Sequence, residues 1–153
     1  MFNTSKPFIR HCTIQDVDEL AVTIRKEDVE EISLASGRNP LDTLMAGFRD
    51  SRSLQTIEWK GKVVAIFGVV GDPGEAGSPW MLGTDDLRRC WSVLRECQEL
   101  VEEYTETYQY LVNSVWSKNL AHIRWLKWLG FQFNGSILKN GETFLYFHRR
   151  ANV

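Results

Sequence analysis

The sequence lacks an excess of positive charge. Its 18 lysines and arginines are outnumbered by 20 aspartates and glutamates, which gives a formal net charge of −2 at pH 7. General affinity for nucleic acid requires a basic surface that neutralises phosphates. We therefore expect no nucleic-acid partner, although this balance does not exclude a local basic patch.

Long apolar runs are also lacking. No stretch approaches the roughly 20 apolar residues that a membrane-spanning helix needs. The first residues, Met-Phe-Asn-Thr-Ser-Lys-Pro, lack the apolar centre of a signal peptide. These absences predict a protein that stays in the cytoplasm and has no membrane partner.

Cysteine is sparse and shows no metal-binding pattern. Cys12, Cys90 and Cys97 cannot all pair with one another, and none belongs to a Cys-x-x-Cys motif or a Cys/His cluster with zinc spacing. We interpret them as buried thiols in a reducing compartment. No metal site is expected.

The remaining composition is that of an ordinary globular domain. The chain has 153 residues, 43% of them apolar and 25% charged, which is enough to bury a core. No linker, repeat or low-complexity segment divides it. We expect a single domain over residues 1–153.

Local patterns predict the elements that precede residue 110. An edge strand over 7–13 should end at Thr13, which would cap a helix together with Asp16. Residues 27–34 either continue that helix or start a second one. Further expected elements are a helix over 41–48, a hairpin of strands 54–59 and 62–70 with a turn at Lys60-Gly61, a surface loop over 72–79, a short strand over 80–83 and a long helix over 87–108.

The stretch Tyr110–Phe131 organises the rest of the chain. Tyr110–Trp116 is apolar, aromatic and β-branched, as in a buried strand. After a polar turn, residues 121–129 have apolar positions three and four apart, which predicts a short helix that Gly130 ends. A helix N-terminus beside a strand end offers unpaired N–H groups, so this junction suits ligand binding. The side chains expected to be buried here are Trp116, Ile123, Leu126 and Phe131.

The sequence of this stretch carries a family resemblance. NLAHIRWLKWLGF, residues 119–131, resembles the last motif of the GNAT acyltransferases, in which an Asn begins a short helix that ends in Leu-Gly-Phe. Val115-Trp116, Asn119 and the following His122 and Leu126 are similar, more narrowly, to the small GNAT-like internal virion protein of short-tailed podoviruses. The resemblance covers roughly residues 55–150.

The resemblance implies an α/β (α+β) fold of the GNAT type. Its central sheet would be mixed but largely antiparallel, with helices on both faces, and the strands ending near Leu82 and Trp116 would be parallel and splayed. Acetyl-CoA would bind in the cleft between these two strands. Asn119 matches the family position that contacts the cofactor, although an Asn can also simply cap a helix. The residues implied near the cofactor are Asn119, Leu82, Gly83, Arg88, Arg89 and Trp116.

The phosphate-binding turn departs from the family pattern. Active GNAT enzymes have a Gln/Arg-x-x-Gly-x-Gly/Ala turn, in which main-chain N–H groups hold the pyrophosphate. Residues 82–89, LGTDDLRR, contain one glycine and two carboxylates. Asp85 and Asp86 would repel phosphate unless Arg88 and Arg89 offset them. Thr84-Asp85-Asp86 also reads as an ordinary helix N-cap.

The position of the family's general acid also departs from the GNAT pattern. Many GNAT enzymes have a tyrosine seven residues after the Asn, where this chain has Leu126. His122 or Tyr110 could substitute as the acid, although a surface role for His122 is the simpler interpretation. Glu58 or Asp85 is the candidate base.

Three hypotheses follow. The first is a GNAT-fold phage protein with a degenerate site, which binds acetyl-CoA weakly or not at all and acts in virion assembly or as an internal virion protein. Its partners would be phage structural proteins in the infected host's cytoplasm, with packaging in the virion as a further expectation. The second is an active N-acetyltransferase that acts on a small amine or a protein. The third is an unrelated αβ module whose tryptophans line a partner surface, namely Trp80, Trp91, Trp116, Trp125 and Trp128.

Overall fold

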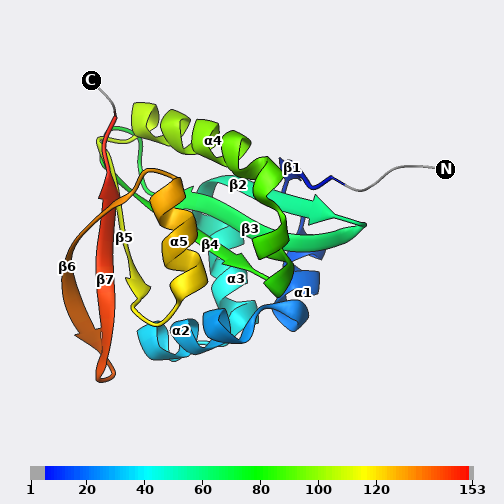
Figure 1. Cartoon of the computed structure of the whole chain (residues 1–153), viewed down its shortest axis with the longest axis horizontal. Helices are drawn as coiled ribbons and strands as arrows, with labels where there is room; N and C mark the ends of the chain where they lie inside the picture. The colour runs from blue at the N-terminus through cyan, green and yellow to red at the C-terminus, as the bar shows by residue number, and fades with distance from the viewer. Residues whose placement is uncertain (1–5, 152–153) are drawn as a thin grey trace.

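The structure, a computed structural model, describes residues 6–151, which form a seven-stranded sheet with helices on both faces (Figure 1). The strands are β1 (Phe8–His11), β2 (Ser51–Trp59), β3 (Lys62–Val70), β4 (Ala76–Gly83), β5 (Tyr110–Trp116), β6 (Gln132–Lys139) and β7 (Glu142–Arg149). The α-helices are α1 (Ile14–Thr23), α2 (Lys26–Ser36), α3 (Pro40–Asp50), α4 (Leu94–Thr107) and α5 (Leu120–Trp128), and two 3₁₀ turns are η1 (Asp85–Arg89) and η2 (Trp91–Val93).

The strand order is β1-β2-β3-β4-β5-β7-β6. Every neighbouring pair is antiparallel except β4 and β5, which are parallel. This confirms the expected α/β fold with a mixed, largely antiparallel sheet. No helix within residues 6–151 is long and apolar enough to cross a membrane.

The two faces of the sheet carry separate hydrophobic cores. Ile66 and Leu82 belong to the core that α1, α2 and α3 cover, whereas Phe67 and Met81 belong to the core under α4 and α5. Successive strand residues point to opposite faces, so each central strand contributes to both cores. This burial on both sides explains why β3 is apolar over almost its whole length.

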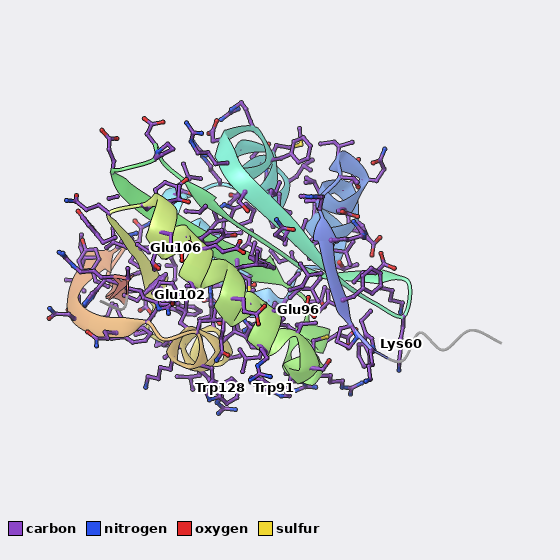
Figure 2. The ribbon with its side chains drawn as sticks, turned by 90° about the horizontal axis from the view of Figure 1, so that it is seen from above. Lys60, Trp91, Glu96, Glu102, Glu106 and Trp128 are labelled. Atoms are coloured by element: carbon purple, nitrogen blue, oxygen red, sulfur yellow. The ribbon has the colours of Figure 1, made fainter. Side chains whose placement is uncertain are left out.

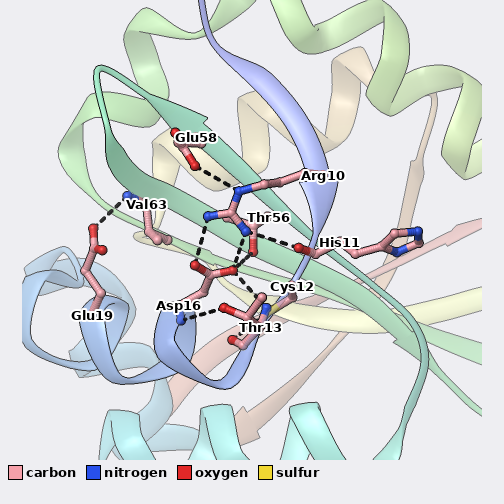
Figure 3. A network of polar contacts seen from close by, with 9 residues as sticks. All are labelled: Arg10, His11, Cys12, Thr13, Asp16, Glu19, Thr56, Glu58 and Val63. Carbon is pink, nitrogen blue, oxygen red and sulfur yellow. Dashed lines mark hydrogen bonds and ion pairs between the residues drawn. The ribbon is translucent and has the colours of Figure 1, made fainter.

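The junction of β1 and α1 is held by a polar network around Asp16 (Figure 3). The expected capping box is present, because the Thr13 side chain accepts from the Asp16 N–H and the Asp16 carboxylate accepts from the Thr13 N–H. Arg10 donates to both Asp16 oxygens at 2.6 and 2.9 Å, and the Thr56 hydroxyl donates at 3.0 Å. The network fixes α1 to the sheet edge.

Other local predictions are confirmed by the backbone. Lys60 and Gly61 both have positive φ, 54° and 74°, as a tight hairpin turn requires. Gly130 ends the turn after α5 with φ of 89°. The strand expected over Tyr110–Trp116 has those bounds as β5.

The prediction of one long helix over 87–108 is wrong for its first seven residues. The chain makes the two 3₁₀ turns first, and α4 begins only at Leu94. Cys90, between the turns, has φ of −102° and ψ of 36°, which interrupts helical geometry. Cys90 and Cys97 therefore do not share one helix, although both are buried.

This break also sets the position of Trp91, which lies in the second 3₁₀ turn and not on α4. Trp91 and Trp128 are exposed, and their rings lie side by side with centroids 3.7 Å apart, near the ends of α4 and α5 (Figure 2). Trp116 and Trp125 are buried, as core packing predicts.

Three further boundaries differ from the expectations. β4 begins at Ala76, inside the expected surface loop, and residues 27–34 belong to α2, a helix separate from α1. Strand β7 had no counterpart among the expected elements. Trp116, Leu126 and Phe131 are buried as expected, but Ile123 is only partly buried.

Candidate functional site

The parallel strands β4 and β5 separate soon after they meet. They pair at Ala76 with Tyr110 and at Gly77 with Leu111. Beyond these pairs, Asn113 Nδ2 donates across the gap to the Pro79 carbonyl at 2.8 Å. The splay that the sequence predicted between the strands ending near Leu82 and Trp116 is thus confirmed.

A cavity of about 340 Å³ occupies this gap. Ile32 and Trp80 line it on the side of α2 and α3, and Tyr104 and Trp125 line it on the side of α4 and α5. The lining is mainly apolar, and the volume lies within the range of small-molecule sites. The cavity therefore passes through the sheet and is bordered by both faces.

A buried polar network lies where the two strands end. The Asn119 amide oxygen accepts from Arg25 Nη2 at 2.9 Å, and its Nδ2 donates to Asp28 Oδ1 at 2.9 Å and to Glu31 Oε1 at 3.1 Å. Asn119 is 0% exposed, and Arg25 and Asp28 are also buried. Every polar atom of the Asn119 side chain is thus bound within the protein.

The same α2 side chains bind the ends of β4 and β5. The Gly83 N–H donates to Asp28 Oδ2 at 3.0 Å, and the Trp116 N–H donates to Glu31 Oε1 at 3.0 Å. The Gly83 carbonyl accepts from the Arg25 N–H at 2.9 Å. Helix α2, which lies below the end of β5 in Figure 1, therefore occupies main-chain groups of both splayed strands.

The other expected cofactor residues lie around this network. Leu82 lines the large cavity, and Gly83 has both main-chain polar groups bound. The Trp116 indole is buried and donates to Glu142 Oε1 at 3.0 Å. Asn119 is the N-cap residue of α5, as one interpretation expected, but its side chain makes no capping hydrogen bond to the helix.

The expected phosphate turn borders a second, smaller cavity of about 120 Å³. Asp85 and Arg88 line it together with Arg25 and Arg124, but Arg89 does not. The Thr84 hydroxyl accepts from the Asp86 N–H at 3.3 Å, which agrees with the N-cap interpretation of this segment. Arg88, of the two candidate arginines, is the one placed beside this cavity.

The structure does not bring the three candidate catalytic residues together. His122 lines the large cavity. Tyr110 lies at the paired end of β5, with Arg150 above its ring at 5.4 Å, and Glu58 on β2 accepts from Arg10 at 2.8 Å. Neither Tyr110 nor Glu58 borders the cavity, so His122 alone of the three is placed to meet a ligand there.

The sequence did not single out Arg25, Asp28 or Glu31. These residues are spaced by three along one segment, and that spacing places charged groups along one side of a helix. An exposed, solvated helix face gives the same pattern. Only the contacts with β4, β5 and Asn119 distinguish a helix face that binds the strand ends from one that faces solvent.

Cys90 and Cys97 are buried as expected, whereas Cys12 is only partly buried. Burial raises the pKa of the Cys90 thiol to about 11 and that of Cys97 to about 12. Both therefore carry a proton at neutral pH, as structural thiols do. Among residues 6–151, no three His, Cys, Asp or Glu side chains are placed to hold a metal ion.

Sequence comparison gives the family. Residues 53–136, more than half of the chain, match the family described as "Bacteriophage T7, probable scaffold protein Gp13". The chain is also 31% identical over 104 residues to "Probable scaffold protein gp13" of Escherichia phage T7, across 65% of this chain and 72% of that protein. The chain belongs to the Gp13 family.

Structure comparison gives the fold of this Gp13 family member. It is similar to the ribosomal-protein-alanine N-acetyltransferase from Brucella melitensis, with a TM-score of 0.65 and 19% identity over 94% of this chain and 99% of that one. It is also similar to a GNAT-family acetyltransferase from Bacillus anthracis, with a TM-score of 0.68 and 10% identity over 97% and 96%. A third similar structure is that of AAC(6')-Ib in complex with ribostamycin and coenzyme A. Its TM-score is 0.67 and its sequence identity 15%, over 95% of this chain and 94% of that one. The chain has the GNAT fold, so the hypothesis of an unrelated αβ module is wrong.

The Gp13 match includes only part of the network at the strand ends. Gly83, Trp116 and Asn119 lie within residues 53–136, whereas Arg25, Asp28 and Glu31 lie outside that range. The α2 side chains therefore come from the part of the chain that precedes the matched region.

Proposed function

We propose that this protein is a non-catalytic GNAT-fold component of phage particle assembly. Its membership of the Gp13 family, whose relative in phage T7 is described as a probable scaffold protein, supports the assembly role. Its partners are then phage structural proteins, met in the cytoplasm of the infected host, and the protein is packaged as an internal virion protein.

The observation that carries the non-catalytic part is the bond between Asp28 and the Gly83 N–H. A cofactor in the gap between β4 and β5 needs main-chain groups of these strands as partners. Here Asp28, Glu31 and Arg25 already occupy groups of Gly83 and Trp116. A cofactor that took these N–H groups would leave the buried Asp28 and Glu31 carboxylates with fewer partners, and its binding would have to compensate for that loss.

The phosphate turn supports the same proposal. Asp85 and Glu27 line the smaller cavity and oppose the charge of a phosphate there, against the positive charges of Arg25, Arg88 and Arg124. The free volume of about 120 Å³ is well below that of ordinary small-molecule sites. We expect acetyl-CoA to bind no tighter than about 0.1 mM, or roughly −5.5 kcal/mol.

One observation favours an active N-acetyltransferase as the second candidate. The cavity of about 340 Å³ passes through the gap between the splayed strands, and His122 borders it. A histidine imidazole can act as an acid or a base. In this candidate, an amine would enter from the side of α2 and α3 and attack the thioester carbonyl of acetyl-CoA. A C–N bond would form as the C–S bond breaks, CoA would leave as the thiol, and His122 would pass the proton from the amine to the leaving sulfur.

The deciding experiment for the site is a calorimetric titration of acetyl-CoA into the whole protein. The non-catalytic proposal expects no saturable heat below about 0.1 mM and no rise in melting temperature at micromolar ligand. Micromolar binding would contradict it and favour the enzyme. Asn119→Ala removes a buried group, so its folding must first be verified by circular dichroism before loss of that binding is assigned to the site.

The assembly role has its own test. We expect the protein in purified phage particles, detected by mass spectrometry, and a lower yield of infectious particles when its gene is disrupted in the phage. Wild-type particle yield without the protein, together with its absence from particles, would contradict the assembly role whatever the result with acetyl-CoA.

A further inference from the structure

The two cavities beside the strand ends are separate, and the end of β4 shows where the boundary between them lies. Leu82 borders the large cavity of about 340 Å³, and Thr84 borders the small cavity of about 120 Å³. Gly83, between these two residues, borders neither. Because a glycine has no side chain to fill the space between two cavities, another element must supply the barrier there.

Helix α5 lies along both cavities. Its Ala121 and Arg124 border the small cavity, and its Leu126 borders the large one. Of residues 6–151, Trp125 alone borders both. The indole of Trp125 therefore lies at the boundary that β4 shows at its end.

The Trp125 side chain is buried and packed at this position. It is 3% exposed, and its ring centroid lies 5.2 Å from that of Trp91, which borders the small cavity. Its Nε1 is buried without a hydrogen-bond partner among residues 6–151. A buried N–H without an acceptor costs free energy that a purely apolar side chain would not. What this tryptophan contributes at the boundary is thus the bulk of its ring and not a polar contact.

An acyl-CoA cofactor would have to cross this boundary. In the arrangement that the GNAT fold implies, its phosphates lie at residues 84–89, beside the small cavity, and its thioester lies in the large cavity between β4 and β5. The pantetheine arm that joins these two parts of CoA is one extended chain, which needs a continuous channel. The indole of Trp125 interrupts such a channel.

We infer that Trp125 is a steric barrier that divides the cofactor path of this GNAT fold and excludes the pantetheine arm of acyl-CoA. The inference rests on the proposed lack of tight acetyl-CoA binding, and it adds a cause that is independent of charge. Asp85 opposes a phosphate and Asp28 occupies the Gly83 N–H, whereas Trp125 acts on an uncharged chain. The barrier should therefore exclude the arm even when the phosphates are absent.

The probe for this barrier is S-acetylpantetheine, which has the arm and the thioester but no phosphate. In a titration followed by NMR, we expect the wild type to bind it with a Kd above about 10 mM, and Trp125→Ala and Trp125→Leu with a Kd of about 1 mM or tighter. Both variants shorten a buried side chain, so their folding is first verified by circular dichroism. Trp125→Leu keeps an apolar side chain and is the milder change.

Trp128→Ala is the matched control, because Trp128 is 40% exposed and borders neither cavity. This variant should bind the probe no better than the wild type. Free indole gives a second measurement on Trp125→Ala. It has the shape of the missing ring, so it should enter the opened space and weaken binding of the probe.

Binding of S-acetylpantetheine to the wild type as tight as to the Trp125 variants would overturn the inference. No binding to a folded Trp125 variant, or an equal gain in Trp128→Ala, would overturn it too. The proposed function is tested separately, by acetyl-CoA and the wild type. If the wild type does not bind acetyl-CoA and a folded Trp125 variant does not bind the probe, the inference alone fails and the proposed function stands.

Discussion

The Asp28 carboxylate and the Gly83 main-chain N–H, 55 residues apart in sequence, are joined by a hydrogen bond of 3.0 Å. This bond fixes α2 to the end of β4, and Glu31 fixes the same helix to the end of β5. A buried ionic and hydrogen-bonded network thus binds the ends of both splayed strands, beside the cavity that lies between them.

Replacing Asp28 should destabilise the protein strongly. Asp28→Ala leaves the Gly83 N–H without its side-chain partner, removes one of the two acceptors of Asn119 Nδ2 and removes a buried counter-charge of Arg25. We expect the free energy of unfolding in urea to fall by about 3–5 kcal/mol. Glu30→Ala, an exposed change on the same helix, should stay within about 0.5 kcal/mol. Equal effects of the two changes would show that the network contributes little.

Removing the two carboxylates of the phosphate turn should strengthen acetyl-CoA binding. Asp85→Gly with Asp86→Gly removes like charge and allows closer main-chain approach. The matched control, Asp72→Gly with Glu75→Gly, makes the same change in net charge in the exposed turn before β4. Calorimetry should show tighter binding in the first variant alone. An equal gain in the control would assign the effect to net charge and not to the turn.

Truncating Phe131 should be costly because its ring is only 5% exposed and packs edge-on against Phe147 at 5.1 Å. We expect Phe131→Ala to lower the free energy of unfolding by roughly 3–5 kcal/mol. Val22→Ala, at a side chain that is 84% exposed, serves as the control and should change it by less than about 0.5 kcal/mol. A loss below about 1 kcal/mol at Phe131 would mean that the Leu-Gly-Phe motif does not belong to the core.

Acid should weaken the junction of β1 and α1. Burial alone would raise the pKa of the Asp16 carboxyl, but the hydrogen bonds from Arg10, Thr13 and Thr56 outweigh burial, so its pKa is lowered in the folded state. Its stabilising contribution is therefore present above the unfolded pKa of about 3.9 and is lost as pH falls through the lower folded value.

The pH prediction is measured as the melting temperature between about pH 2 and pH 6. The wild type should lose stability more steeply than Asp16→Asn, which has no carboxyl to protonate at this position. Parallel curves for the two proteins would show that Asp16 does not contribute to acid unfolding.

The sequence by itself determined the features that depend on neighbouring residues. Thr13 and Asp16 form their capping box across three positions, and Lys60-Gly61 and Gly130 adopt the backbone angles that a tight turn and a helix end require. The Asn119–Phe131 motif indicated the GNAT fold, because a strand, a short helix and a Gly-Phe exit follow one another within a few turns. In each case the interacting groups are close in sequence.

Only the tertiary structure decided which groups meet across the fold. β4 begins inside a glycine-rich stretch because Gly77 packs against the Tyr108 ring, where an added Cβ would lie 2.7 Å from the ring's Cγ. The contact of Asn119 with a cofactor stays a prediction, whereas its contacts within the protein, with Arg25, Asp28 and Glu31, join residues that lie 88 to 94 positions apart in the chain. Charged residues on a helix give the same local pattern whether they face solvent or a strand end. Long-range packing, which no local pattern encodes, therefore decided which side chains bind the ends of β4 and β5.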